Sequence, residues 1–188
     1  MIREPRFGTR SVFLLHIQLR DVEPKIWRRV MVPGSLTLTK LHLVIQGAFD
    51  WEDYHLHRFE IHDLRYGPAD DDYDEELLNE NESQLYQLLR VRDHFIYHYD
   101  FGDNWLHDIV VEGAENASRT LKKALCLDGA RARPPEDIGG VLRFEHLLEV
   151  INNPRHEEYV DYVQWNGEPF KPDLFSLIDT NARIQSRT

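Results

Sequence analysis

The chain has 188 residues, of which 41% are hydrophobic and 29% charged, and its formal net charge is −11 at pH 7. This composition predicts one globular domain in the cytoplasm without membrane contact, because no apolar stretch is long enough for a transmembrane helix and the N-terminus lacks the apolar core of a signal peptide. Cys126 is the only cysteine, which excludes an internal disulfide and a four-cysteine zinc site, and the negative charge disfavours nonspecific attraction to nucleic acid phosphates.

The first quarter of the chain predicts a β-hairpin followed by a helix. Apolar and polar residues alternate over 12–19 and again over 25–32, with a turn between the two runs. Over 38–49 the apolar residues change to a spacing of three and four, which is typical of an amphipathic helix. Thr37 or Thr39 is the expected N-cap of this helix.

The middle of the chain predicts three further strands. Alternation returns over 54–61, and a dense acidic run over 70–76 indicates a solvated loop. A short helix or turn is expected within 82–92. Two strands, over 94–100 and 104–112, are expected to form a hairpin around Phe101-Gly102.

The last third predicts helices after an irregular stretch over 113–140. The expected helices cover 144–151, 156–164 and 173–178. Strands followed by helices favour an α+β fold with an antiparallel sheet over a wound βαβ sheet. We therefore expect a single domain over 1–188 with its core over about 12–180. Helix 38–49 should pack on a twisted sheet that the C-terminal helices close.

Residues 95–107, with the sequence FIYHYDFGDNWLH, combine aromatic, imidazole and carboxylate side chains. A two-residue turn at Phe101-Gly102 would place four potential ligands of a divalent metal on one side of the hairpin: His98, Asp100, Asp103 and His107. The alternative is that the aspartates flank a turn in solvent and accept backbone donors. Phenylalanine also fits poorly at the positive φ that such a tight turn demands.

Two other segments carry candidate site residues. His55 and His57 are two apart on a predicted strand, so they would point the same way, either as binding residues or as structural histidines at the edge of the core. Glu136 and Asp137 follow two prolines on a rigid loop. Glu136 is the candidate catalytic base and Asp137 a candidate binding residue, and the alternative for both is loop capping or pairing with an arginine.

Arginine and aromatic residues could bind a partner instead. Arg28 and Arg29 are expected on opposite faces of a strand, one exposed and the other close to an acidic partner. Four aromatic side chains could stack on bases or on a partner, although aromatics on alternating strands more often belong to the core. They are Trp27, Trp51, Tyr99 and Trp105.

Several short sequence motifs resemble those of the plasmid pRiA4b ORF-3-like family, and their order and spacing match over about residues 12–180. The most specific are Ile26-Trp27-Arg28-Arg29, His55-Leu56-His57-Arg58-Phe59, the run from Tyr97 to Trp105, and Pro134-Pro135-Glu136-Asp137 with Gly139-Gly140. The resemblance implies a compact α+β fold and a family of unknown function, some of whose members carry a transposon-associated label. A tyrosine is usual shortly after the double glycine in that family, whereas this chain has Phe144 nearby.

Two functions follow as hypotheses. The first is a cytoplasmic interaction module, associated with mobile genetic elements by resemblance, that binds protein or nucleic acid. The alternative is a hydrolase that uses a divalent metal on phosphodiesters, with Glu136 as its base. Both require distant polar side chains to meet in one pocket. The residues concerned are His55, His57, Asp100, Asp103 and Glu136.

Overall fold

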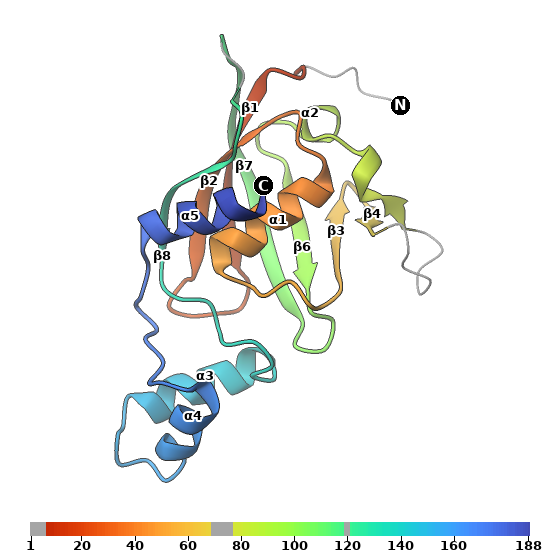
Figure 1. The fold of residues 1–188 in the computed structure, drawn as a ribbon. Coiled ribbons are helices and arrows are strands. Elements are labelled where there is room, and N and C mark those ends of the chain that lie inside the picture. The colour runs from red at the N-terminus through yellow and green to blue at the C-terminus, as the bar shows by residue number, and fades with distance from the viewer. Residues whose placement is uncertain (1–6, 69–76, 119–120) are drawn as a thin grey trace.

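The computed structural model describes residues 7–68, 77–118 and 121–188, so the predicted acidic loop over 70–76 lies outside the described residues (Figure 1). Eight strands form one sheet in the order β5-β4-β3-β6-β7-β1-β2-β8, and all neighbouring strands are antiparallel except β4 and β5. The strands are β1 Ser11–Leu19, β2 Trp27–Pro33, β3 His57–Ile61, β4 Leu64–Gly67, β5 Leu78–Asn79, β6 His94–Tyr99, β7 Trp105–Asn116 and β8 Leu125–Ala130.

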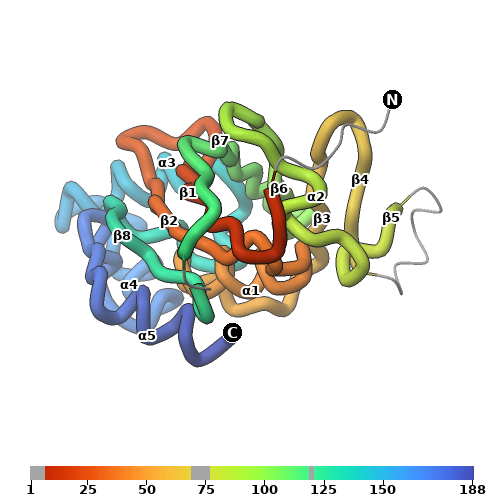
Figure 2. The backbone as a smooth tube through the Cα atoms, turned by 90° about the horizontal axis from the view of Figure 1, so that it is seen from above, coloured from red at the N-terminus to blue at the C-terminus, as the bar shows by residue number. Residues whose placement is uncertain are grey.

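Helices cover one face of the sheet and lie beyond one of its ends. They are α1 Leu38–Phe49, the short η1 Glu80–Glu82 and α2 Leu85–Leu88, then α3 Gly140–Ile151, α4 Tyr159–Asn166 and α5 Leu177–Arg187. α1 and α5 pack against each other on one face of the sheet (Figure 1 and Figure 2). α3 and α4 lie beyond the end of the sheet where β6 turns into β7 (Figure 1). Among the described residues, no helix has the length and apolar character needed to cross a membrane.

The α+β prediction is confirmed, and so are the first hairpin and helix. Residues Phe13, Leu15 and Ile17 of β1 are fully buried, as their alternation predicts. α1 begins after Thr37, whose side chain accepts a hydrogen bond from the Lys40 N–H, so Thr37 is the N-cap. These elements were predictable because local periodicity and tertiary burial agree.

The contact between α1 and α5 depends on Gly47. A Cβ at this position would lie 2.9 Å from the backbone nitrogen of Ile184, so only glycine allows the two helices to approach this closely. Ile184 and Thr180 are fully buried in the contact. The last helix differs from the prediction over 173–178: it begins after Ser176 and continues through Arg187, because its buried residues lie beyond the predicted end.

The hairpin between β6 and β7 has a different register from the one predicted. Tyr99 pairs with Trp105, so the loop covers residues 100–104 instead of Phe101-Gly102 alone. Asp100 and Asn104 adopt the positive φ angles, 55° and 60°, which these residue types tolerate better than phenylalanine. His107 therefore pairs with Tyr97 and His98 with Leu106, which places the two histidines on opposite faces of the sheet.

Candidate functional site

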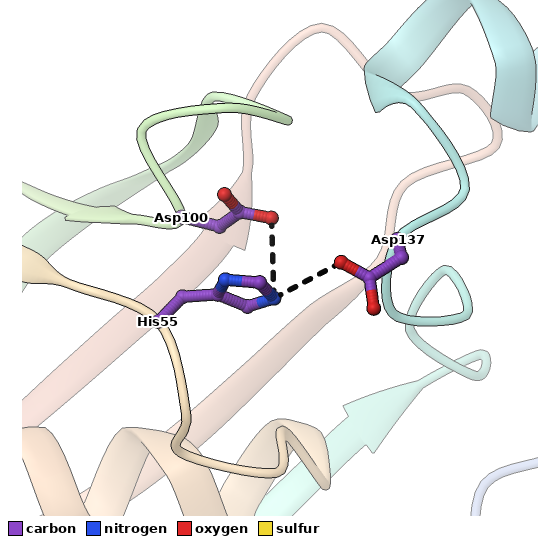
Figure 3. Close-up of side chains that lie close together, drawn as sticks. All are labelled: His55, Asp100 and Asp137. Atoms are coloured by element: carbon purple, nitrogen blue, oxygen red, sulfur yellow. Dashed lines mark ion pairs between the residues drawn. The ribbon is translucent and has the colours of Figure 1, made fainter.

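Three segments that are far apart in the sequence meet at the end of the sheet (Figure 3). His55 lies just before β3, Asp100 is the first residue after β6, and Glu136 and Asp137 lie in the loop before α3. The Asp100 N–H donates to the Leu56 carbonyl at 3.0 Å and so fixes the first two segments to each other. The predicted strand over 54–61 begins only at His57, which leaves His55 free to turn toward the carboxylates.

Nε2 of His55 is the centre of this cluster. It lies 3.3 Å from Asp137 Oδ1 and 3.6 Å from Asp100 Oδ2, the two ion pairs drawn in Figure 3. It also lies 3.9 Å from Glu136 Oε2. One ligand atom each of His55, Asp100 and Asp137 lies within 4.8 Å of the others. Nevertheless, His55 Nε2 is buried without a hydrogen bond, and so is Glu136 Oε2. A buried polar atom without a partner is rare in proteins, and here two of them face each other.

Glu136 is held rigidly although one of its oxygens has no partner. Its side chain is 5% exposed. Oε1 accepts hydrogen bonds from the Glu52 N–H at 2.8 Å and from the Tyr99 hydroxyl at 3.3 Å. Burial raises the pKa of Glu136 above its usual value. Oε2 is therefore the basic atom that this carboxyl presents to the cluster.

The two carboxylate oxygens of Asp100 make different contacts. Oδ1 accepts hydrogen bonds from the N–H groups of Gly102 at 2.9 Å and Asp103 at 3.3 Å, which closes the hairpin loop. Oδ2 is left to face His55. The alternative that the aspartates serve the turn is thus correct for one oxygen of Asp100, and the other oxygen belongs to the cluster.

Asp103 docks the hairpin loop against the loop that carries Glu136 and Asp137. Its Oδ2 accepts a hydrogen bond from the Gly139 N–H at 2.9 Å. Gly140 has a φ of +80°, and a Cβ there would lie 2.9 Å from the Asp103 carbonyl oxygen. The double glycine therefore permits a close backbone approach that a side chain would prevent. Asp103 is a positioning residue and not a member of the cluster.

Asp137 and Tyr54 form the exposed side of the cluster. The Asp137 side chain is 63% exposed, and its backbone adopts a positive φ of 56°. The Tyr54 hydroxyl donates to Asp137 Oδ2 at 3.1 Å. Partial desolvation, together with this hydrogen bond, raises the pKa of Tyr54 to about 12. Tyr54 therefore stays protonated at neutral pH and orients the Asp137 carboxylate.

The predicted metal set does not converge. Asp100 lies in the cluster, but Asp103 docks a loop, and the two histidines lie on opposite faces of the sheet. His98 packs against the Phe101 ring at a centroid distance of 4.7 Å. His107 is fully buried and accepts a hydrogen bond from Trp51 Nε1 at 3.1 Å. The one-residue difference in register separates them.

His57 lies in a second cluster instead of joining His55. It pairs with Glu80 at 2.9 Å, and its ring stacks on His42 at 3.6 Å. His42 bonds in turn to Tyr97 and to Asp53. Both imidazole rings have hydrogen-bond or ion-pair partners among these neighbours. His57 therefore fits the prediction of a structural histidine.

We expected one of Arg28 and Arg29 to be exposed and the other to have an acidic partner, but Arg28 is buried. Its guanidinium lies over the Phe49 ring at 5.0 Å and over the Phe175 ring at 4.7 Å. It donates to four main-chain carbonyls, those of Trp27, Ala48, Ala130 and Arg131. Arg29, on the opposite face, pairs with Glu112 at 2.7 Å. Both arginines therefore hold the sheet together.

Tyr99 and Trp105, two of the four aromatic candidates, have different roles. Tyr99 belongs to the site, because its hydroxyl donates to Glu136. Trp105 is fully buried and packs on Trp51, so it belongs to the core and not to a binding surface. We expected His55, Asp100 and Glu136 to meet, and the structure brings them together. That Asp137 joins them was missed, because the spacing within each segment carries no information on how the segments meet.

A cleft of about 560 Å³ adjoins the cluster, and Glu136 and Asp137 line both. Trp165 of α4 contributes to the wall of the cleft and is 50% exposed. One feature of the sequence indicates that Trp165 is exposed: it is an aromatic residue in a helix without a clear apolar face. Solvent and a ligand can therefore reach the cluster from the side of Asp137.

Known proteins are similar to this chain in sequence and in fold. A family profile described as "Plasmid pRiA4b ORF-3-like protein" matches residues 11–179. The "Uncharacterized protein y4hQ" of Sinorhizobium fredii is 34% identical over 161 residues, which cover 84% of this chain and 81% of that protein. A crystal structure of a protein of unknown function, MM3350 from Methanosarcina mazei Go1, has a TM-score of 0.83 and 35% identity, and the match covers 92% of this chain and 98% of that one.

Proposed function

The chain belongs to the plasmid pRiA4b ORF-3-like protein family, and we propose that it is a metal-dependent hydrolase with one divalent cation. Three residues would bind the ion, namely His55, Asp100 and Asp137, and Glu136 would be the general base. The observation that carries this proposal is the pair of buried atoms without hydrogen bonds, His55 Nε2 and Glu136 Oε2, which lie 3.9 Å apart. A cation would bind His55 Nε2, and a water on that cation would donate a hydrogen bond to Glu136 Oε2.

Two of the three distances between the proposed ligand atoms fit a first-row divalent metal, and the third is within 4.8 Å. Bonds of about 2.0–2.2 Å at tetrahedral angles place neighbouring ligand atoms roughly 3.3–3.6 Å apart. His55 Nε2 lies 3.3 Å from Asp137 Oδ1 and 3.6 Å from Asp100 Oδ2. One imidazole with two carboxylates suits zinc, manganese or iron. Three protein ligands leave a coordination position open, as in catalytic sites.

The residues around the ion fit a hydrolytic reaction. The metal would polarise the bond to be cleaved and lower the pKa of an attacking water. Glu136 Oε2 faces His55 at 3.9 Å and would accept the proton of that water. Its raised pKa makes it a stronger base than an exposed glutamate. Tyr99 and the Glu52 N–H hold the other oxygen, so Oε2 cannot rotate away.

Metal binding can be measured directly by titration calorimetry with Mn²⁺ and Zn²⁺ on metal-free protein. We expect one ion per chain and a higher melting temperature with metal. Asp137→Asn should weaken binding at least tenfold without unfolding the protein, because this side chain is 63% exposed. His62→Ala, which removes an exposed imidazole from the turn after β3, is the matched control. Equal affinity of Asp137→Asn and His62→Ala would refute the site.

Hydrolysis is tested separately with Glu136→Gln. This variant keeps the hydrogen-bond acceptor for the Glu52 N–H and removes the basic oxygen. It should bind metal as the unchanged protein does and lose turnover of any model ester, amide or phosphodiester that the unchanged protein cleaves. Turnover by Glu136→Gln at the original rate would remove Glu136 from the mechanism.

The interaction-module hypothesis is supported by the cleft, but its charge favours protein over nucleic acid as the partner. Six acidic residues and three arginines line the cleft, a balance that repels phosphates. The same balance disfavours a phosphodiester as the substrate of the hydrolase. Filter binding of short DNA and RNA at low salt should show no salt-sensitive retention. Retention that falls as salt rises would restore a nucleic acid partner.

A further inference from the structure

The cleft beside the cluster has a strongly acidic wall. It lies between the end of α1, the loop before α3 and the segment that joins α4 to α5. Its acidic lining residues are Asp50, Glu52, Glu136, Asp137, Glu168 and Asp179. The basic lining residues are Arg28, Arg133 and Arg183. Acidic lining residues therefore outnumber basic ones two to one.

The three arginines are already engaged. Arg28 donates only to main-chain carbonyls, so its charge serves the packing beneath the cleft. Arg133 donates to the Asp50 carbonyl and lies 3.6 Å from the Glu52 carboxylate. Arg183 pairs with the Asp50 carboxylate at 3.1 Å. An anionic ligand would have to displace these contacts to reach the arginines. A cationic ligand could pair with the remaining carboxylates.

A second hollow of about 310 Å³ lies next to the cleft, beside α4. It shares Asp137 and Trp165 with the first, and its other lining residues include Glu158 and Asp161. No lysine or arginine is among its described lining residues. Two adjacent acidic hollows suit an extended ligand with more than one positive charge better than a single small cation.

α4 presents aromatic surface to these hollows. None of the eight residues of α4 is buried, although the helix carries Trp165 and Tyr162. Trp165 is 50% exposed and lies at the boundary that both hollows share. The face of an indole attracts guanidinium and ammonium groups. The helix therefore combines the carboxylate of Asp161 with an exposed aromatic ring, which is the chemistry that recognises arginine and lysine side chains.

We infer that the two hollows bind a basic peptide segment, with an arginine or lysine side chain against Trp165 and its charge between Asp137 and Asp161. The segment would belong to a partner protein and would lead its backbone past the His55 cluster. If the proposed hydrolase function holds, this partner is also its substrate. The binding of the peptide itself requires no metal.

The test uses a fluorescent peptide with alternating arginine and glycine residues, and a glutamate peptide of the same length. Anisotropy is measured on the full chain in the presence of EDTA. The basic peptide should bind, with an affinity that falls as salt rises, and the glutamate peptide should not. Equal binding of the two peptides would overturn the inference. Spermidine that matches the affinity of the basic peptide would also overturn it, because the site would then recognise charge without a peptide.

Two variants locate the binding surface. Trp165→Ala and Asp161→Asn should each weaken peptide binding about fivefold or more, and the melting temperature should hold because α4 has no buried residue. Glu115→Gln, at an exposed position on β7, is the matched control for charge. Unchanged affinity in both α4 variants refutes the site. Peptide binding in EDTA combined with a failed metal titration would overturn only the hydrolase, and metal binding without peptide binding would overturn only this inference.

Discussion

The buried imidazole of His107 should make the stability of this protein depend on pH. His107 is fully buried, and burial lowers its pKa from 6.5 to about 3. Between these two values the unfolded chain binds a proton at His107 and the folded chain does not. The free energy of unfolding therefore falls as the pH is lowered from 6.5 toward 3. At pH 4.5, two units below the unfolded pKa, the loss from His107 alone is about 3 kcal/mol relative to pH 8.

The variant His107→Gln isolates this contribution. Glutamine keeps a side-chain acceptor for the Trp51 N–H and removes the titration. The variant should be less stable at pH 8, and the difference should narrow by about 1.4 kcal/mol per pH unit below pH 6. Denaturant unfolding between pH 4.5 and 8 measures both slopes, and His62→Gln, at an exposed position, should follow the unchanged protein. Parallel curves for His107→Gln and the unchanged protein would refute the reasoning.

Three further substitutions test the packing and the docked loops. Gly47→Ala should lower the free energy of unfolding by about 1–3 kcal/mol, because its Cβ would meet the α5 backbone at 2.9 Å. The control Gly113→Ala, whose Cβ would lie 4.0 Å from Leu14 Cβ in ordinary contact, should change it by less than about 0.5 kcal/mol. Asp103→Ala should weaken divalent metal binding in calorimetry by roughly tenfold, since the Gly139 N–H loses its acceptor, and unchanged affinity would contradict its positioning role. Arg28→Met should cost about 2–4 kcal/mol in denaturant unfolding by leaving buried carbonyls unpaired, and a loss below about 1 kcal/mol would contradict that account.

The fold could be predicted where burial follows a local period. Strand β1 and helix α1 each bury the residues that their spacing selects, so the α+β class and the first three elements follow from the sequence. The end of α5 could not be predicted, because its buried residues Thr180 and Ile184 matter only through the contact with Gly47. That contact joins helices more than 100 residues apart in the chain, and no local pattern records it.

The site could be predicted in part. The sequence singled out His55, Asp100 and Glu136, and the structure brings these three together with Asp137. It also expected His57 to join them, but a strand places residues two apart on one face only where both lie within it, and β3 begins at His57. The position of His55 is set by the segment before the strand, which periodicity does not describe.

The register of one hairpin decides which chemistry the site can hold. In the predicted register four ligands would have clustered on one side of the hairpin, around its turn. In the observed register Asp100 leaves the strand and takes a positive φ, which Asp and Asn tolerate at little cost. Its carboxylate then closes the loop with one oxygen and faces His55 with the other. The shift thus moves the candidate metal centre from the sheet to its end, where the loop before α3 supplies Glu136 and Asp137 and where the acidic cleft begins.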